Sequence, residues 1–318
     1  MNPSYPVYIV SKGRWNSRQT SKALHMMGVP HFMIVEQQEY DNYRAVVDDS
    51  ATLLVLDSAY QDEYDTCDEL GEDKSKGPGP ARNFAWRHAM DAGHEWHWVM
   101  DDNIRRFYRL NRNLKIPAAD GTPLFCMEQF ATRYENVSMV GPNYTFFAPR
   151  KIKLPPYVLN TRIYSCNLIR NDVEFRWRGR YNEDTDLSLR MLKDGCCTVQ
   201  FNAFLQQKAP TQTVRGGNTS DFYAKEGTLP KSSMLFRMHP DVTQLMWRFG
   251  RPHHYVDYSP YRANRLRRKA GIEIPTGINE YGATYQERVG ERWVTTTPPQ
   301  GGPNGDRPKS ATRSSRAK

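Results

Sequence analysis

Long hydrophobic runs are absent from the sequence. Apolar stretches such as Leu53–Leu56 are far shorter than the roughly 20 residues that cross a bilayer. The first residues also lack a basic segment followed by an apolar one, which is the pattern of a secretory signal. We therefore expect a cytoplasmic protein that does not contact a membrane.

Cysteine is scarce, with five residues in a chain of 318. The number is odd, and no two cysteines have the Cys-x-x-Cys spacing of a zinc ribbon or a redox pair. Neither a disulfide framework nor a structural zinc site is expected. This cysteine usage fits a reducing compartment.

Charge is present but unevenly distributed. The formal net charge is +9, residues 61–73 hold seven acids, and residues 247–269 hold seven basic residues and one acid. The basic segment favours a polyanionic partner, although a solvated helix surface has the same composition. From about Thr295 the chain is rich in proline, glycine, serine and basic residues. That composition predicts a disordered basic tail over residues 295–318.

Apolar segments alternate with helical patterns in the first hundred residues. Helices are expected at 17–27 and 80–93, separated by an acidic, then glycine-rich stretch that predicts an exposed loop at 57–79. A further helix is expected at 186–193. Strands are expected at 5–10, 31–35, 52–56, 96–100, 137–140, 163–169 and 198–204. The alternation predicts one α/β domain over residues 1–294 with a mainly parallel sheet flanked by helices.

Two adjacent acids follow the strand expected at 96–100. In an open α/β sheet, ligands bind outside the carboxyl ends of the strands, where Asp101 and Asp102 stand. Adjacent carboxylates repel each other unless a positive group joins them, and Mg²⁺ or Mn²⁺ holding a diphosphate is the natural partner. The alternative is structural, because Asp102 or Asn103 could cap a following helix.

A second acidic cluster opens the helix expected near residue 186. It contains Glu183, Asp184 and Asp186. A carboxylate within reach of a hydroxyl group can take its proton while that oxygen attacks an electrophile. The alternative is a helix start at which the dipole favours acids.

The residues Ala81-Arg82-Asn83, followed by Trp98–Asn103, resemble the donor-binding core of glycosyltransferases with the GT-A fold. The resemblance implies a Rossmann-like mixed sheet, with a donor half at about 1–110 and an acceptor half at about 111–294. It implies that Asp102 binds the metal, that Asp101 binds the ribose or the metal shell, and that Asn103 supports them. It also implies that Asp184 is the general base, with Glu183 and Asp186 as alternatives.

GT-A enzymes often complete the metal site with a histidine from the C-terminal part. The resemblance therefore makes His239 a candidate ligand, with His253 and His254 as competitors. A single histidine is otherwise more often a packed or surface residue.

Several segments together resemble the glycosyltransferases associated with TET/JBP-type pyrimidine hydroxylases in bacteriophages. They are Val10–Trp15, Asp101–Asn103, Glu183–Leu187, Gly216–Thr219 and Lys231–Pro240. The resemblance implies transfer of a sugar, with inversion, from a nucleotide sugar such as a UDP-sugar to the hydroxymethyl group of 5-hydroxymethylcytosine in DNA. It implies Mn²⁺ or Mg²⁺ as the cofactor and, for a phage protein, the cytoplasm of an infected bacterium as the location.

Several residues are candidates for contact with the donor. Lysine and arginine after the first strand can meet phosphates, and paired glycines let backbone amides approach a sugar, although each could equally serve a turn. These candidates are Ser11, Lys12, Arg14, Arg82, Gly216 and Gly217.

Two basic and aromatic segments are candidates for contact with DNA. Arginines can neutralise phosphates and aromatic rings can stack on a base that has left the duplex. The first segment, a possible wedge, contains Arg176, Trp177, Arg178 and Arg180; its alternative is a surface loop with Trp177 folded onto the core. The second contains Arg248, Arg251, Tyr255, Arg262 and Arg265.

Three other functions remain open on the sequence. A GT-A enzyme could act on a polysaccharide, a lipid or a protein. A metal-dependent nuclease could hold two cations between Asp101, Asp102, Glu183 and Asp184, but it would leave Arg82-Asn83 unexplained. A non-catalytic DNA-binding protein would keep its function after Asp102→Ala.

Overall fold

The computed structural model describes residues 1–68, 75–208, 229–248, 250–272, 286–289 and 292–295. The chain divides into two units, Met1–Lys269 and Ala270–Lys318. In the second unit, β13 (Gln286–Val289) and β14 (Arg292–Thr295) form an antiparallel hairpin. The expected tail lies almost wholly outside the described residues, as do Gly216 and Gly217.

One mixed sheet organises the first unit, in the order β3-β2-β1-β4-β9-β7-β10-β5-β6, with β8 beside β10. Strands β1 to β4 are parallel to one another, whereas β9 runs antiparallel between β4 and β7. Their bounds are β1 Val7–Val10, β2 His31–Val35, β3 Ala51–Val55, β4 Trp96–Asp101, β5 Ile104–Asn111, β6 Leu114–Pro117, β7 Val137–Tyr144, β8 Tyr157–Leu159, β9 Cys166–Arg170 and β10 Cys197–Lys208.

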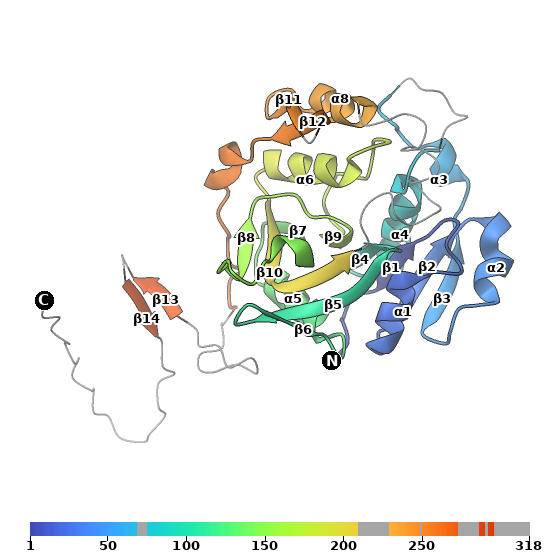
Figure 1. Cartoon of the computed structure of the whole chain (residues 1–318), viewed down its shortest axis with the longest axis horizontal. Coiled ribbons are helices and arrows are strands. Elements are labelled where there is room, and N and C mark those ends of the chain that lie inside the picture. The colour runs from blue at the N-terminus through green and yellow to red at the C-terminus, as the bar shows by residue number, and fades with distance from the viewer. Residues whose placement is uncertain (69–74, 209–228, 249, 273–285, 290–291, 296–318) are drawn as a thin grey trace, which may run out of the picture. The chain divides into compact units, whose positions relative to one another are not determined.

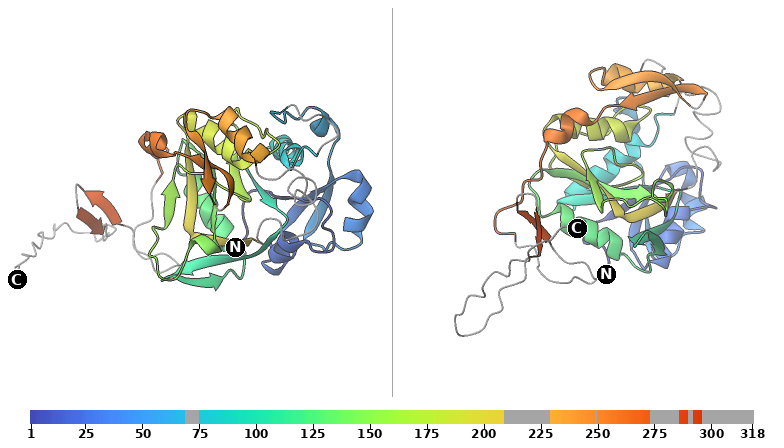
Figure 2. Two further views of the ribbon diagram at one scale, coloured as in Figure 1. Left: turned by 45° about the horizontal axis from the view of Figure 1, so that its top comes forward. Right: turned by 60° about the vertical axis from the view of Figure 1, so that its left-hand side comes forward.

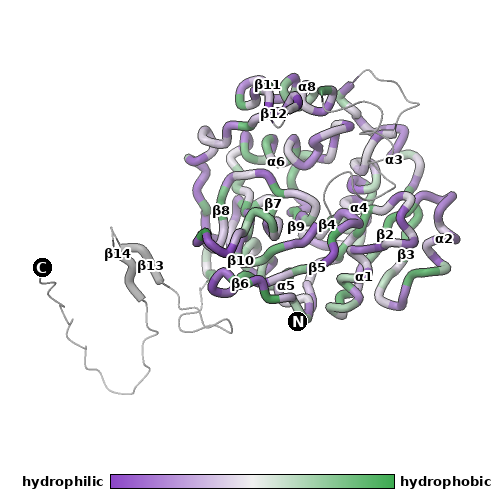
Figure 3. The backbone as a smooth tube through the Cα atoms, viewed as in Figure 1, coloured by the Kyte–Doolittle hydropathy of each residue, from purple (hydrophilic) through white to green (hydrophobic). Residues whose placement is uncertain are grey.

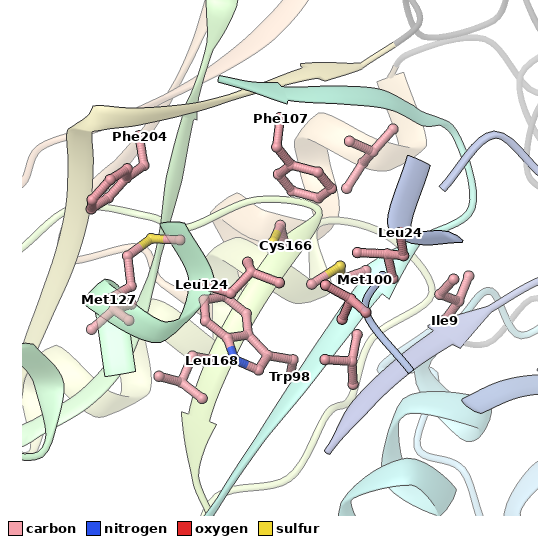
Figure 4. Close-up of a cluster of buried hydrophobic side chains, with 14 of the residues drawn as sticks. Ile9, Leu24, Trp98, Met100, Phe107, Leu124, Met127, Cys166, Leu168 and Phe204 are labelled. Atoms are coloured by element: carbon pink, nitrogen blue, oxygen red, sulfur yellow. The ribbon is translucent and has the colours of Figure 1, made fainter. Parts of the chain in front are cut away.

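Helices cover both faces of this sheet, which explains why β1 is buried at every position. Val7 and Ile9 pack in the cluster that contains Leu24 of α1 and Leu124 of α5, and Figure 4 shows this cluster. Tyr8 and its neighbours pack on the other face with α4 and α6, which lie across the sheet from α5 in Figure 1. The helices are α1 Gln19–Met26, α2 Tyr40–Arg44, α3 Ala59–Asp62, α4 Gly79–Asp91, α5 Thr122–Ala131 and α6 Glu183–Lys193, with 3₁₀ turns η1 Gln37–Glu39 and η2 Thr145–Phe147.

A further layer lies outside α6. It consists of α8 (Leu229–Met238), the hairpin of β11 (Thr243–Arg248) and β12 (Arg251–Val256), and the 3₁₀ turn η4 (Ser259–Ala263). Leu189 and Leu192 of α6 pack there against Leu235 of α8, and both views of Figure 2 show this layer over α6.

The expected α/β fold, a mixed sheet flanked by helices, is confirmed, and the first four strands and α4 lie where the pattern predicts. The expected loop at 57–79 contains the short helix α3. The hairpin of β5 and β6 was not predicted. In β5 only Ile104 and Phe107 are buried, three residues apart, so the strand lacks the period of two that would reveal it. No helix in the described part of the chain is long and apolar enough to cross a bilayer.

Candidate active site

The carboxyl ends of β1 and β4 open into a cavity of about 400 Å³. Val10 of β1 pairs with Asp101, the last residue of β4. This register brings the residues that follow them, Ser11 and Asp102, to the same edge of the sheet. The N-terminus of α6 lies at the same cavity, whose charged lining includes Lys12, Arg14, Arg82, Asp101, Asp102, Glu183, Asp184, Lys208 and Lys231.

Arg82 joins the two acidic motifs. Its side chain is only 2% exposed, and its guanidinium donates to Asp101 Oδ1 at 2.7 Å, Asp184 Oδ1 at 2.8 Å and Glu183 Oε1 at 3.1 Å. Burial by itself would lower the pKa of Arg82, but the three carboxylates raise it, so the charge is retained. The guanidinium also stacks on the ring of Trp177, 4.5 Å from its centroid. One arginine of α4 thus fixes β4 and the start of α6 together.

Asp101 is held by a second cation. Lys208, the last residue of β10, donates to Asp101 Oδ2 at 2.5 Å and to Ser165 Oγ at 2.7 Å. Burial would raise the pKa of Asp101, but Lys208 and Arg82 outweigh it and hold that pKa well below its usual range. Asp101 is therefore ionised and fully engaged by protein donors.

Asp102 is less well compensated. It pairs with Arg14 and accepts a 2.8 Å hydrogen bond from Ser11 Oγ. Ser11 Oγ in turn lies 2.6 Å from the hydroxyl of Tyr43. Burial raises the pKa of Asp102 above its usual value although Arg14 and Ser11 act against it. An additional positive charge at this carboxylate would be favourable.

Asp102 and Asn103 fit the expected divalent cation. Asn103 Oδ1 is buried and accepts no hydrogen bond from any described residue. The described residues contain no cluster of three or more acidic, histidine or cysteine side chains suited to a metal. Mg²⁺ usually takes only one or two carboxylates and completes its shell with water and substrate phosphates. An undercompensated carboxylate beside an unpartnered amide oxygen suits that mode of binding.

Asp184 has the properties of a general base. It stands at the N-terminal turn of α6, following Asn182, which adopts the left-handed conformation with φ 57°. Burial raises the pKa of Asp184 to about 7, because Glu183 and Asp101 add to it while Arg82 only partly opposes it. A carboxylate that titrates near neutrality can both accept and release a proton.

Asp186 faces the opposite way. Residues two apart on a helix point to different sides, and Asp186 is fully buried on the side away from Asp184. It accepts hydrogen bonds from Arg190 Nε at 2.8 Å, His239 Nε2 at 2.9 Å and Arg178 Nη2 at 3.2 Å. These donors lower its pKa against the effect of burial. Its contacts are those of a structural ion cluster.

The three candidate histidines lie in two places. His239 is bound to Asp186 and does not line the cavity, whereas His253 and His254 of β12 do. Burial, together with nearby Lys231, lowers the pKa of His254 to about 3, so this ring is neutral.

The arginine-rich run before α6 is packed against the protein. Trp177 is 2% exposed beneath Arg82, and Arg180 is 1% exposed and pairs with Asp68 at 2.7 Å. Arg176 stacks on Trp86 at 4.6 Å from the ring centroid, and Arg178 pairs with Asp186. The structure therefore agrees with the alternative of a segment folded onto the core and gives no support for a DNA wedge.

The second basic segment is at the surface. The hairpin that carries His253 and His254 also carries exposed arginines. Further exposed arginines follow in η4 and just after it. Its exposed candidates are Arg248, Arg251, Tyr255, Arg262 and Arg265.

Sequence reasoning missed Lys208 and an aromatic group at the cavity. Lys208 was overlooked because the predicted strand ended at residue 204, before the polar end of β10. The aromatic residues lie at the end of β7, on η2 and before β9. An adjacent Phe-Phe pair followed by basic residues was the available signal. The group consists of Tyr144, Phe146, Phe147 and Tyr164.

Similarity to one protein family covers most of the first unit. The model of that family, described as TET-Associated Glycosyltransferase, matches residues 5–217. No curated protein matches the chain.

Proposed function

The chain belongs to the TET-associated glycosyltransferases, and from this membership we propose that it transfers a sugar from a nucleotide sugar to the hydroxymethyl group of 5-hydroxymethylcytosine in DNA. The chain is a glycosyltransferase because its family is one. The observation that carries the proposed chemistry is the junction at Arg82, which joins the donor-side carboxylate Asp101 to the proposed base Asp184. A transferase needs both groups within one cavity.

The donor end of the reaction is assigned to the β1–β4 edge. Ser11, Lys12 and Arg14 bind the nucleotide and its phosphates, with a UDP-sugar as the expected donor. Asp102 and the unpartnered amide oxygen of Asn103 would hold Mn²⁺ or Mg²⁺. When bound, that cation would stabilise the negative charge that develops on the departing diphosphate.

The acceptor end of the reaction is assigned to the start of α6. Asp184 takes the proton of the hydroxymethyl group as its oxygen attacks the anomeric carbon. The bond from that carbon to the diphosphate oxygen breaks, and the nucleoside diphosphate leaves with the bonding electrons. Attack on the face opposite the leaving group inverts the configuration. Arg82 orients Asp184 through Oδ1.

A transfer assay on defined DNA tests the proposal. The protein, Mn²⁺ or Mg²⁺ and a panel of nucleotide sugars are incubated with duplex DNA that contains 5-hydroxymethylcytosine, and the nucleosides are then weighed by mass spectrometry. We expect a gain of one sugar mass with one donor. The gain is absent on unmodified DNA and with Asp184→Asn.

The matched control is Asp91→Asn, because Asp91 is an exposed aspartate at the end of α4. It is expected to behave as the wild-type protein. Hydrolysis of one donor without transfer to DNA would agree with a glycosyltransferase but would reject DNA as its acceptor. A product that retains the donor's configuration would reject the role of Asp184.

A further inference from the structure

Two segments of the chain contain no acidic residue at all. Between Asn136 and Asn171 the sequence has five basic residues and no aspartate or glutamate, and the same holds from Ile104 to Ala119. With 35 acids in 318 residues, a segment the length of the first would ordinarily contain several. Neither segment was among the expected DNA contacts.

The fold brings these two segments side by side. Arg112 and Asn113 form the turn between β5 and β6 with φ of 48° and 61°, the left-handed conformation of a tight hairpin turn. Asn113 Nδ2 then donates to the backbone oxygens of Arg150 and Ile152, at 3.1 and 3.2 Å. The hairpin tip is thereby attached to the segment that precedes β8. In Figure 3 the tube is strongly hydrophilic between the labels β8 and β6.

The positive charge on this surface has no acidic partner among the described residues. Six of its basic side chains are exposed, and none of the six has an ion pair with another described residue. We call them the basic surface: Arg105, Arg106, Arg112, Arg150, Lys151 and Lys153.

Two exposed phenylalanines lie at the cavity, a few residues before Arg150. Phe146 and Phe147 are 62% and 50% exposed and both line the cavity. The ring of Phe146 is stacked on Tyr144 with centroids 5.1 Å apart and planes 13° apart. The Tyr144 hydroxyl lies 2.8 Å from Ser165 Oγ, which also contacts Lys208. The aromatic stack is therefore connected to the carboxylates of the site.

We propose that Phe146 and Phe147 stack on the acceptor base while the basic surface holds the phosphates on either side of it. The proposal rests on the proposed function and identifies where the DNA lies. A base must leave the duplex before its hydroxymethyl group can reach a carboxylate inside a cavity, such as Asp184. Aromatic rings stack on any base, and arginine and lysine neutralise phosphates. Phe146 and Phe147 line the cavity, and Arg150 is separated from Phe147 by only two residues, so that aromatic and basic groups adjoin along the chain.

The stacking part is tested with Phe146→Ala/Phe147→Ala. The specificity constant for 5-hydroxymethylcytosine DNA should fall roughly 5- to 150-fold, the range for removal of stacking on one base. Both rings are exposed, so the urea concentration at the midpoint of unfolding should stay close to the wild-type value. Met26→Ala, which removes an exposed apolar side chain elsewhere, is the control. Wild-type transfer by the double phenylalanine variant would overturn the proposal.

The phosphate part is tested through the salt dependence of DNA binding. In Arg150→Gln/Lys151→Gln/Lys153→Gln, the slope of log K against log salt should decrease by roughly 0.9 for each phosphate that the variant no longer neutralises. Lys22→Gln/Arg44→Gln/Arg87→Gln removes three exposed charges elsewhere and should keep the wild-type slope. The proposal is overturned if the first triple variant keeps that slope while Arg248→Gln/Arg251→Gln lowers it.

The two proposals fail in different ways. A wild-type protein that hydrolyses its donor but neither binds nor modifies DNA would reject DNA as the acceptor, and this surface with it. A wild-type protein that modifies DNA at a rate unaffected by these variants would reject only the location of the DNA. If an added acidic polysaccharide suppresses hydrolysis of the donor more strongly than added DNA does, both proposals are also rejected.

Discussion

Arg82 donates to Asp184 Oδ1 at 2.8 Å from a guanidinium that is itself 2% exposed. The base of the proposed reaction is thus positioned by a residue of a different helix, and that residue also holds the last carboxylate of β4. The position of Asp184 on the proposed acceptor side is therefore linked to that of Asp101 on the proposed donor side through one side chain.

Arg82→Lys should lose most of the transfer activity. An ammonium group on a shorter, unbranched stem cannot reproduce the planar set of donors that meets three carboxylates. Arg82→Ala should also destabilise the fold by about 3–5 kcal/mol, because it removes the buried cation that Asp101, Glu183 and Asp184 share. Transfer assays and urea unfolding measure the two effects. Arg87→Lys, further along α4 and 62% exposed, is the control, and equal losses in both variants would contradict the role of Arg82.

The pH profile should report Asp184. Its pKa is raised to about 7, and a base acts only when deprotonated, so the specificity constant should fall about tenfold per pH unit as the pH drops below 7. Asp184→Asn should lose about 10²- to 10⁴-fold in rate and this dependence with it. A profile that is flat between about pH 5 and 8 would contradict the assignment.

The same group should make stability fall as pH rises. The folded protein keeps the proton of Asp184 up to about pH 7, whereas the unfolded chain releases it near 3.8. The folded state therefore binds more protons within this window, and the free energy of unfolding decreases by up to about 1.4 kcal/mol per pH unit from this group alone. Urea unfolding of the wild type and Asp184→Asn across this window measures the difference in slope. Parallel curves would show that the pKa of Asp184 is not raised in the folded protein.

Asp102 and the metal should be linked. Chelation with EDTA should remove transfer, and Mn²⁺ or Mg²⁺ should restore it. Asp102→Asn should need a higher Mn²⁺ concentration for half-maximal rate, because a neutral amide is a weaker ligand than a carboxylate. His239→Gln should leave this concentration unchanged, since His239 is bound to Asp186. Full activity of the wild type in EDTA would contradict a role for the metal in transfer.

Asp186→Asn should lower stability rather than turnover. The side chain is fully buried among Arg178, Arg190 and His239, and removing its charge costs about 3–5 kcal/mol. The pKa of Asp186 is lowered in the folded protein. The stabilisation by its charge is therefore present at pH values above the ordinary pKa of 3.8 and is lost as the pH falls below it. Unfolding curves and the rate per folded molecule separate the two roles. A stable variant without turnover would contradict a purely structural role for Asp186.

The sequence could locate the donor edge because local rules determine it. Asp101 and Asp102 directly follow an apolar run, and the ligand edge of a parallel sheet lies at the carboxyl end of its strands. Helix geometry could also have separated Asp184 from Asp186, since residues two apart do not share a face. The two aspartates were therefore never equivalent candidates for one base.

The remaining features depend on tertiary contacts that no local pattern contains. The run from Arg176 to Arg180 resembles an exposed basic loop, but its side chains are partnered by Trp86, Asp186 and Asp68. Lys208 extends a strand beyond its apolar part, so hydrophobic periodicity ends too early. Asn113, which attaches one basic segment to another, acts through two backbone oxygens.

The near balance of charge within the cavity has a consequence for how the enzyme responds to its surroundings. Arg14, Arg82 and Lys208 already face the acids there, and these buried pairs are screened little by dissolved ions, whereas an exposed basic surface is screened strongly. Under the proposed function, added salt should therefore weaken the binding of DNA to the basic surface more than it weakens the ion pairs inside the cavity. High salt should then lower transfer to DNA more than it lowers hydrolysis of the nucleotide sugar by water, so that the transferase turns into a slow hydrolase.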